Sequence, residues 1–274
     1  MNIITSNQNS IVKEVRCLRH KKDREEKGLF FIEGVRFVEE ALKEKVDIDK
    51  ILISDKLEQI RGGKEILSLI NTAGKDVYLL SDKLFRELSD TENPQGILAT
   101  IKYKKLKLDE ILNKGNFYII LDSLQDPGNM GTIMRTADAA GASGVIISKG
   151  CVDLYNPKVL RSTMGAIFHI PICFTDNLIE TIAQLKTRGI RIYAAHLKGE
   201  ANYFEVDMRK DVAIIIGNEA NGISEEVAAY SDMLIKIPMP GRAESLNASV
   251  AASILMYEVV RQRCCGAGLR LGSK

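Results

Sequence analysis

Three stretches of the chain follow apolar runs and carry polar side chains that can do chemistry: 121–141, 214–224 and 235–253. In the first, LDSLQDPGNMGTIMRTADAAG, Asn129 and Arg135 are six residues apart, so both can lie at the loop end of one helix. A guanidinium among small apolar neighbours is suited to gripping phosphate or carboxylate through two parallel hydrogen bonds. The alternative is structural, because Asn129 is also a favourable helix N-cap.

The second stretch, IIIGNEANGIS, delivers Gly217, Asn218 and Glu219 directly after an apolar run. Its glycines have the spacing of a phosphate-binding loop, but Ile223 and Ser224 stand where that loop needs Lys followed by Ser or Thr. We therefore reject a phosphate-binding loop. A turn rich in Gly and Asn either leaves backbone amides for a neutral ligand such as adenosine or simply joins a strand to a helix.

The third stretch, IKIPMPGRAESLNASVAAS, begins as an irregular loop because prolines and a glycine interrupt it. Ser245, Asn247 and Ser249 then open the last helix among small residues. If the role of Ser245 is structural, we expect it to be the N-cap of that helix. Small residues also permit close approach of the backbone to a ligand or to another helix, and both interpretations stay open.

The residue pattern argues against several other kinds of site. The histidines, His20, His169 and His196, are scattered and neither CxxC nor HExxH occurs, so we expect no metal centre. No GxSxG precedes a helix and no GxGxxG follows a strand, which disfavours a hydrolase triad and a dinucleotide site. The five cysteines show no disulfide spacing, so we expect reduced thiols in a cytoplasmic protein.

The elements that position these stretches form two α/β domains. In the first, a helix expected over residues 10–27 and ended by Gly28 precedes alternating strands and helices, and the charged KYKKLKLDE segment ends the domain. In the second, apolar strand cores such as VAIII predict a doubly wound parallel sheet. Ligands of such sheets bind beyond the carboxyl ends of the strands, which is where all three stretches lie. The tail, 264–274, is expected to fray.

The composition excludes some classes of protein. Of 274 residues, 45% are hydrophobic and 27% are charged, and the net charge is +2, which rules out wholesale disorder and nucleic-acid binding by charge alone. No apolar run is long enough to span a membrane, and the start lacks the order of a signal peptide. Two basic segments, 13–27 and the lysines of 102–107, either contact phosphates or are ordinary solvated faces.

Together, LDSLQDPGNMGTIMRTADAAGASGVIIS, IIIGNEANGIS and IPMPGRAESLNASVAASILMYE resemble, in order and spacing, the three motifs of the SpoU (TrmH-type) RNA 2′-O-ribose methyltransferases of the SPOUT superfamily. NPKVLRSTMGAIFHIP looks like the segment between the first two motifs. The resemblance covers roughly residues 116–262. It implies an α/β fold with an N-terminal L30e-like α/β substrate-binding domain (1–107) and a SPOUT α/β-knot (trefoil-knotted) methyltransferase domain (108–274). The resemblance of the front part of the chain to an L30e-like domain is less distinct.

The resemblance also implies an activity and its residues. A family member binds S-adenosylmethionine in knotted loops, works as a homodimer and methylates a ribose 2′-hydroxyl in RNA; we expect ribosomal rather than transfer RNA. The residues implied to line the cofactor pocket are Gly217, Ile237 and Leu246, with 194–197 nearby. The residues implied to be catalytic are Asn129, Arg135, Glu219, Ser245 and Asn247.

In this family the residue matching Arg135 is the proposed general base. A guanidinium has a pKa of about 12 or above, so we hypothesise that Arg135 mainly clamps the adjacent phosphate and stabilises the developing alkoxide. Glu219 and Asn129 would then orient Arg135 and the ribose, and Ser245 and Asn247 would shape the substrate side. The alternatives are a transfer-RNA 2′-O-methyltransferase, a non-catalytic RNA-binding protein that keeps the fold, or another nucleotide-binding α/β enzyme. No metal or membrane partner is expected.

Overall fold

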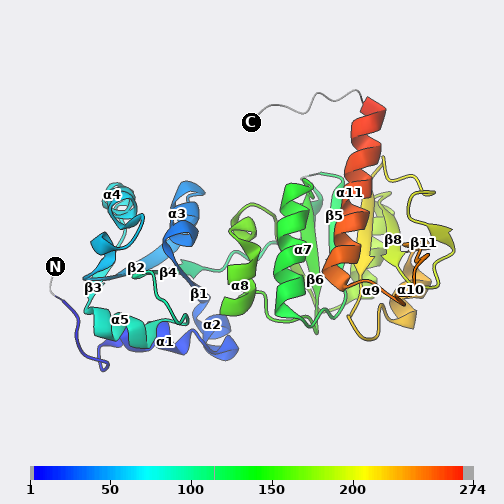
Figure 1. Ribbon diagram of the computed structural model, residues 1–274. Helices are drawn as coiled ribbons and strands as arrows, with labels where there is room; N and C mark the ends of the chain where they lie inside the picture. The colour runs from blue at the N-terminus through cyan, green and yellow to red at the C-terminus, as the bar shows by residue number, and fades with distance from the viewer. Residues whose placement is uncertain (1–2, 114, 268–274) are drawn as a thin grey trace. The chain divides into compact units, whose positions relative to one another are not determined.

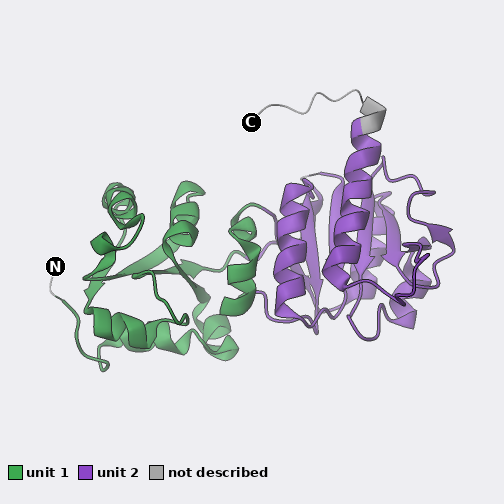
Figure 2. Cartoon of the chain, in the orientation of Figure 1, with its two compact units in different colours: residues 1–104, 155–169 green, residues 105–154, 170–274 purple. Residues whose placement is uncertain are grey.

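The computed structural model describes residues 3–113 and 115–267, with backbone alone for 265–267. It divides into two compact units, coloured separately in Figure 2. Unit 1 consists of residues 1–104 and 155–169, and unit 2 consists of 105–154 and 170–274. A segment from the middle of the chain therefore folds with the front unit.

Unit 1 is a four-stranded sheet with helices on both sides (Figure 1). Its strands are β1 (Leu29–Glu33), β2 (Ile48–Ser54), β3 (Val77–Leu80) and β4 (Ile97–Lys102). Its helices are α1 (Ser10–Cys17), α2 (Lys21–Lys27), α3 (Val35–Lys43), the short η1 (Leu57–Gln59), α4 (Gly63–Ala73), α5 (Asp82–Leu88), α8 (Pro157–Thr163) and the short η2 (Ala166–Phe168). The strand order is β1-β4-β2-β3, in which β4 is antiparallel to both neighbours and β2 is parallel to β3.

The helix expected over residues 10–27 is two helices, so that prediction is wrong in its middle. The cause is Arg24, which is only 2% exposed and donates hydrogen bonds from Nη1 to the carbonyl oxygens of Leu18 (2.7 Å) and Arg19 (2.8 Å). These carbonyls end α1, and the chain turns before α2 begins. The expected stop at Gly28 is confirmed: it takes the left-handed conformation that glycine adopts without strain, with φ of 64°.

The segment 155–169 is fastened to the rest of unit 1 by aromatic and charged side chains. The ring of Tyr155 lies 4.2 Å from that of Tyr103 and 4.7 Å from that of Phe30, measured between centroids. Arg161 pairs with Asp90 at 2.9 Å. Stacked aromatic rings bury large apolar areas, so this segment belongs to the core of unit 1.

Unit 2 is a seven-stranded sheet in which every adjacent pair of strands is parallel. Its strands are β5 (Phe117–Leu121), β6 (Gly144–Ser148), β7 (Ile172–Thr175), β8 (Arg191–Ala195), β9 (Ala201–Asn202), β10 (Val212–Ile216) and β11 (Met233–Lys236). Its helices are α6 (Leu108–Leu112), α7 (Pro127–Ala139), α9 (Leu178–Thr187), α10 (Glu225–Tyr230) and α11 (Ala248–Ala267). The parallel α/β sheet predicted from the apolar strands is confirmed. Two short elements, α6 and β9, were not expected from the sequence.

The strand order, β7-β6-β5-β10-β8-β11-β9, places β5 beside β10 at the centre of the sheet. The chain runs from β5 outward to β7 on one side and then fills the other side, so the order reverses at this pair. Ligands of open parallel sheets bind where the order reverses, beyond the carboxyl ends of the strands. The first two polar stretches leave the sheet at these two strand ends and are therefore neighbours.

Helices cover both faces of this sheet. α7 and α11 pack against each other and against β6 and β10, as Figure 1 shows for the α7–α11 pair. On the other face, Tyr118, Ile120 and Ile215 join one core with apolar residues of α6, α9 and α10. Burial on both faces explains why these strands are apolar along their whole length.

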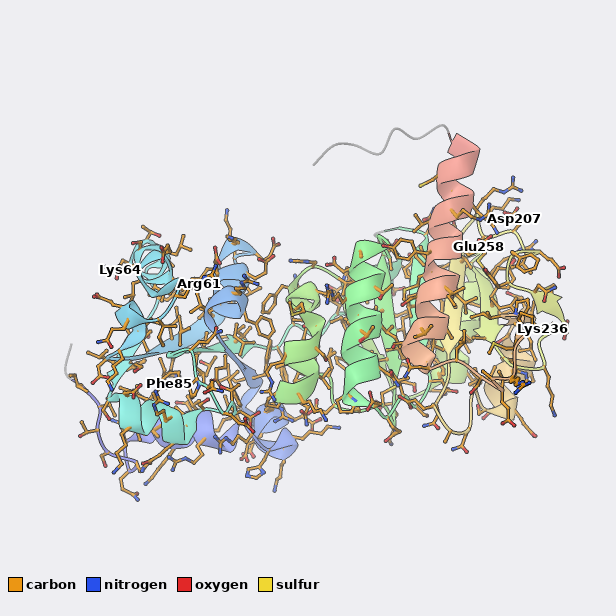
Figure 3. The ribbon with its side chains drawn as sticks, viewed as in Figure 1. Arg61, Lys64, Phe85, Asp207, Lys236 and Glu258 are labelled. Carbon is orange, nitrogen blue, oxygen red and sulfur yellow. The ribbon has the colours of Figure 1, made fainter. Side chains whose placement is uncertain are left out.

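The last helix is longer than predicted. α11 extends to Ala267, so the first part of the tail expected to fray is helical, and 268–274 lie outside the described residues. Glu258 on this helix, labelled in Figure 3, is buried and accepts hydrogen bonds from Arg261 Nε (2.7 Å) and Gln262 Nε2 (2.8 Å). Gln262 also donates to the carbonyl of Val206 and accepts from the amide of Met208, which fastens α11 to the loop before β10.

Candidate active site

The first polar loop leaves β5 and enters α7 through a capped turn. Asp126 is the N-cap, and its Oδ1 accepts the backbone amide of Asn129 at 2.8 Å; Pro127 occupies the first turn. Asn129 is thus the third residue of the helix, and the alternative that it caps the helix is wrong. The backbone amide of Asn129 is bonded to Asp126, and its side chain is bonded to residues of the other two loops. That side chain is buried, with 6% exposed.

Glu219, which follows β10, holds the first loop against the second. Its Oε1 accepts hydrogen bonds from Asn129 Nδ2 (2.9 Å) and the amide of Asp126 (2.9 Å), and its Oε2 accepts one from the amide of Gln125 (3.0 Å). Partial burial acts to raise the pKa of Glu219, but the hydrogen bonds from Asn129 and the two amides outweigh it, so the pKa lies below its ordinary value. Glu219 is therefore a carboxylate that organises its surroundings.

The third loop joins the same group through Asn247. Asn247 Nδ2 donates to Asn129 Oδ1 at 2.9 Å, and Asn247 Oδ1 accepts the amides of Ser249 (2.9 Å) and Val250 (3.3 Å) at the start of α11. Asn247, and not Ser245, thus caps this helix, so the expectation of a Ser245 N-cap is wrong.

The three loops are therefore connected by one chain of hydrogen bonds, which we call the amide relay: Asn247 donates to Asn129, and Asn129 donates to Glu219. Each amide can point in only one direction, because its oxygen and its nitrogen have different partners. The relay fixes the relative positions of three predicted site residues before any ligand arrives.

Arg135 and Ser245 lie apart from the amide relay. Six residues along a helix correspond to about 9 Å and about 1.7 turns, so Arg135 lies farther along α7 than Asn129 and on a different face. The expectation that both lie at the loop end of the helix is therefore wrong. Both Arg135 and Ser245 are exposed. Their side chains are available to a substrate.

The predicted cofactor residues lie around the carboxyl end of the sheet. Gly217 follows β10 and Ile237 follows β11. The segment 194–197 comprises the last two residues of β8, the strand between those two, and the two residues after it. Gly217, Ile237 and Leu246 are all half-buried. A Cβ at Gly217 would lie 2.3 Å from the carbonyl carbon of Gly222, so glycine is required by the close approach of the chain itself. Half-buried apolar side chains beside glycine backbone suit a ligand with an uncharged, partly apolar portion, such as the adenosine of S-adenosylmethionine.

One site residue escaped the sequence analysis. Asp126 caps α7 and places its amide on Glu219. The signal that could have found it is the dipeptide Asp-Pro, since Asp is a preferred N-cap and Pro is favoured at the next position.

Two arginines of the basic segment 13–27 have structural partners within unit 1. Arg19 Nη2 donates to the carbonyl oxygens of Leu88 (2.8 Å) and Ser89 (2.7 Å), and Arg24 is buried. Lys104, Lys105 and Lys107 are exposed, as are Lys13, Lys21, Lys22 and Lys27 of the first segment. Phosphate contacts therefore remain a prediction for both basic segments.

Two further observations concern metals and membranes. Within residues 3–113 and 115–267, Glu40, Glu44 and His169 have ligand atoms within 4.8 Å of one another, but His169 Nε2 already lies 3.0 Å from Glu40 Oε1. This group belongs to unit 1, whereas the amide relay belongs to unit 2. In the described part of the chain, no helix is both long and apolar enough to cross a bilayer.

Comparison with known proteins gives matches over both domains. The SpoU rRNA Methylase family model matches residues 116–257, and the MRM3-like substrate binding domain model matches residues 9–99. The chain is 38% identical over 259 residues to the 23S rRNA (guanosine(2553)-2′-O)-methyltransferase RlmP of Bacillus subtilis, covering 94% of this chain and 99% of that protein.

Solved structures give the same picture. An rRNA methyltransferase from Sinorhizobium meliloti with bound AdoMet matches with a TM-score of 0.84 and 33% identity, covering 95% of this chain and 97% of that one. The SpoU methyltransferase AviRb from Streptomyces viridochromogenes, in complex with AdoMet, matches with a TM-score of 0.85 and 29% identity, covering 93% and 98%.

Proposed function

Because the chain belongs to the SpoU rRNA methylase family, we propose that it transfers a methyl group from S-adenosylmethionine to a ribose 2′-hydroxyl of 23S ribosomal RNA. The amide relay carries this proposal, since it joins the three loops expected to form the site. Its likeness to a 23S rRNA methyltransferase supports ribosomal RNA as the substrate. RNA is selected over DNA by the reaction itself, because DNA lacks the 2′-hydroxyl.

S-adenosylmethionine supplies the methyl group on a sulfonium, and Gly217, Ile237 and Leu246 would hold it at the carboxyl end of the sheet. Displacement at the methyl carbon needs the attacking oxygen held in line at near-attack distance. We assign that positioning to Asn129, which the amide relay fixes. Asn247 supports Asn129 from the third loop, and Ser245 lies on the substrate side.

Loss of the hydroxyl proton is the second requirement. Glu219 is a poor candidate for the base, because three donors occupy its carboxylate and its pKa is lowered. Arg135 is exposed and remains charged at neutral pH. It can therefore grip the phosphate next to the target ribose and stabilise the alkoxide as it forms.

We also propose a homodimer formed through α11 and α7. Val250 and Tyr257 on α11 are 47% and 50% exposed, and residues seven apart on a helix share a face, with Ile254 between them. An exposed apolar stripe beside a second helix suits a second copy of the same chain. Light scattering tests this, because Val250→Glu is expected to yield monomers where the wild type yields dimers.

The front domain, residues 1–107, is proposed to bind the RNA substrate, and residues 108–274, apart from the segment 155–169 that folds with unit 1, to carry the methyl transfer. Its match to a substrate-binding domain supports this division. The trefoil knot is likewise proposed, and membership of the SpoU family supports it. We also propose a cytoplasmic location, which a ribosomal RNA substrate supports.

The decisive experiment measures binding and transfer with the same preparation. Calorimetry with S-adenosylmethionine, ATP and GTP should show binding of the methyl donor alone, and labelled methyl groups should reach unmodified 23S rRNA but not transfer RNA. Transfer to transfer RNA would replace the substrate assignment. A folded protein that binds no S-adenosylmethionine would be a non-catalytic RNA-binding protein, and one that binds ATP or GTP would be a different enzyme.

A further inference from the structure

The side chain of Asn218 joins the first and second loops at a point that the relay does not reach. Its Oδ1 accepts the amides of Ala220 (2.9 Å) and Asn221 (3.0 Å), and its Nδ2 donates to the carbonyl of Ser123 at 2.8 Å. One amide thus shapes its own turn with its oxygen and holds the neighbouring loop with its nitrogen. These protein partners mean that Asn218 acts through other residues and does not need to contact a ligand.

The residue that Asn218 holds is in an unfavourable conformation. Ser123 has φ of 57°, the left-handed region that side chains other than glycine rarely occupy. Its amide donates to Ser148 Oγ at 3.0 Å, so hydrogen bonds on both sides of the residue keep it there. Such a conformation persists only where surrounding contacts enforce it, and it is found at functional sites.

The direction of the chain after Ser123 determines where the next amides point. Two and three residues later, the amides of Gln125 and Asp126 both donate to Glu219. If Ser123 relaxed, these two donors would leave the carboxylate, and Asn129, which Glu219 holds through Oε1, would lose its fixed place.

We propose that Asn218 is a positioning residue for methyl transfer: by holding Ser123 in the left-handed conformation, it keeps the Glu219–Asn129 pair assembled. This inference rests on the proposed function. Asn218 is distinct from the residues named for the site above, because its side chain is bonded to the backbone of Ser123, Ala220 and Asn221 and acts through the backbone of the first loop.

The test uses variants that separate the two ends of the Asn218 amide. Asn218→Asp keeps the oxygen that shapes the turn but sets a carboxylate oxygen against the carbonyl of Ser123. Small displacements of catalytic groups can lower rates about 100-fold. We expect Asn218→Asp and Asn218→Ala to lower kcat on saturating rRNA by about 10-fold to 100-fold, with the Kd for S-adenosylmethionine within about twofold of the wild type.

Rescue provides a readout that a purely structural role would not give. Glycine takes the left-handed conformation without strain, so Ser123→Gly should restore several-fold of the kcat lost in Asn218→Ala while changing the wild type little. Asn221→Ala, an exposed neighbour in the same turn, is the matched control and should keep full kcat. Thermal unfolding identifies any variant that fails to fold. If Asn218→Ala does not fold, the kcat of Asn218→Asp, which preserves the turn, tests the inference.

Three results would overturn the inference: wild-type kcat in Asn218→Asp, loss of S-adenosylmethionine affinity in proportion to kcat, or no rescue by Ser123→Gly. Absence of methyl transfer by the wild type itself would instead refute the proposed function, so the two failures are distinguishable.

Discussion

The candidate site has two halves that differ in how their polar atoms are used. Asn129, Glu219 and Asn247 are bonded to one another through the amide relay. Arg135 and Ser245 are exposed and lie outside it. A side chain that is already hydrogen-bonded to protein loses little further conformational entropy when it positions a substrate. An exposed cation can instead bind a phosphate of the substrate. The candidate site thus combines side chains that are fixed by protein partners with exposed side chains that we propose contact RNA.

The largest expected effect comes from the exposed half. Arg135→Ala should lower kcat by about 100-fold to 1000-fold, as removal of one stabilising donor does at other sites. Stability should change by less than about 0.5 kcal/mol, because the side chain is exposed. Steady-state methyl transfer on saturating rRNA and urea unfolding measure the two quantities. The matched control is Arg191→Ala, which should leave kcat unaltered. Arg191 is an exposed arginine at the amino end of β8, whereas the candidate site lies beyond the carboxyl ends of the strands.

Arg135→Lys sharpens the same test. Lysine keeps the charge but cannot make two parallel hydrogen bonds to a phosphate. Activity of Arg135→Lys equal to that of the wild type would contradict binding of the phosphate through two parallel hydrogen bonds.

Next in size is Glu219→Gln, which should affect both activity and stability. The amide has one acceptor oxygen and presents an NH2 to a backbone donor, so one of the three hydrogen bonds must be lost. We expect a loss of about 1 kcal/mol in the free energy of unfolding, the lower part of the usual range because Glu219 remains water-accessible. kcat should fall by more than tenfold. An unchanged kcat would show that the relay is dispensable.

Substitution of Asn247 should have a smaller effect, with one part on stability and another on activity. Asn247→Ala removes a helix cap and should cost about 0.5–2 kcal/mol of stability. Asn247→Asp keeps the cap on α11 but no longer donates to Asn129, so it should keep its stability and still lose activity. Urea unfolding and kcat, measured on both variants, separate capping from positioning. Full activity in Asn247→Asp would argue that the relay ends at Asn129.

The smallest effect is a dependence of stability on acid pH. The pKa of Glu219 is lower in the folded protein than its unfolded value of about 4.3. Its contribution is therefore fully present above pH 4.3 and is lost as the pH falls through the folded pKa. The difference in unfolding free energy between wild type and Glu219→Gln should shrink over that window. A difference that stays constant down to the lowest pH would mean that folding does not shift the pKa of Glu219.

The sequence predicted the parts of the molecule that follow from local pattern. Fully apolar runs such as 212–216 indicated buried parallel strands, and the three loop motifs indicated a SpoU-type methyltransferase; the family and structure matches confirm both. Glu219 and Asn247, named from their motif, do lie together with Asn129. Their roles in methyl transfer stay a prediction.

What the sequence could not supply depends on contacts between distant residues. The break between α1 and α2 arises because Arg24 folds back onto carbonyls of α1, and helical periodicity carries no sign of that. The direction of Arg135 depends on where α7 begins, which Asp126 decides. The left-handed conformation of Ser123 is likewise enforced by Asn218, which lies 95 residues away in the chain.

The membership of residues 155–169 in unit 1 has a consequence for how such proteins can exchange parts. The chain passes between the two units three times, after Lys104, Leu154 and His169. A front domain taken from a relative by a single crossover near residue 104 would lack the segment whose Tyr155 packs on Phe30 and Tyr103. We therefore expect a hybrid to fold well when residues 155–169 are exchanged together with the front domain, so that two separate stretches of the gene are inherited as one unit.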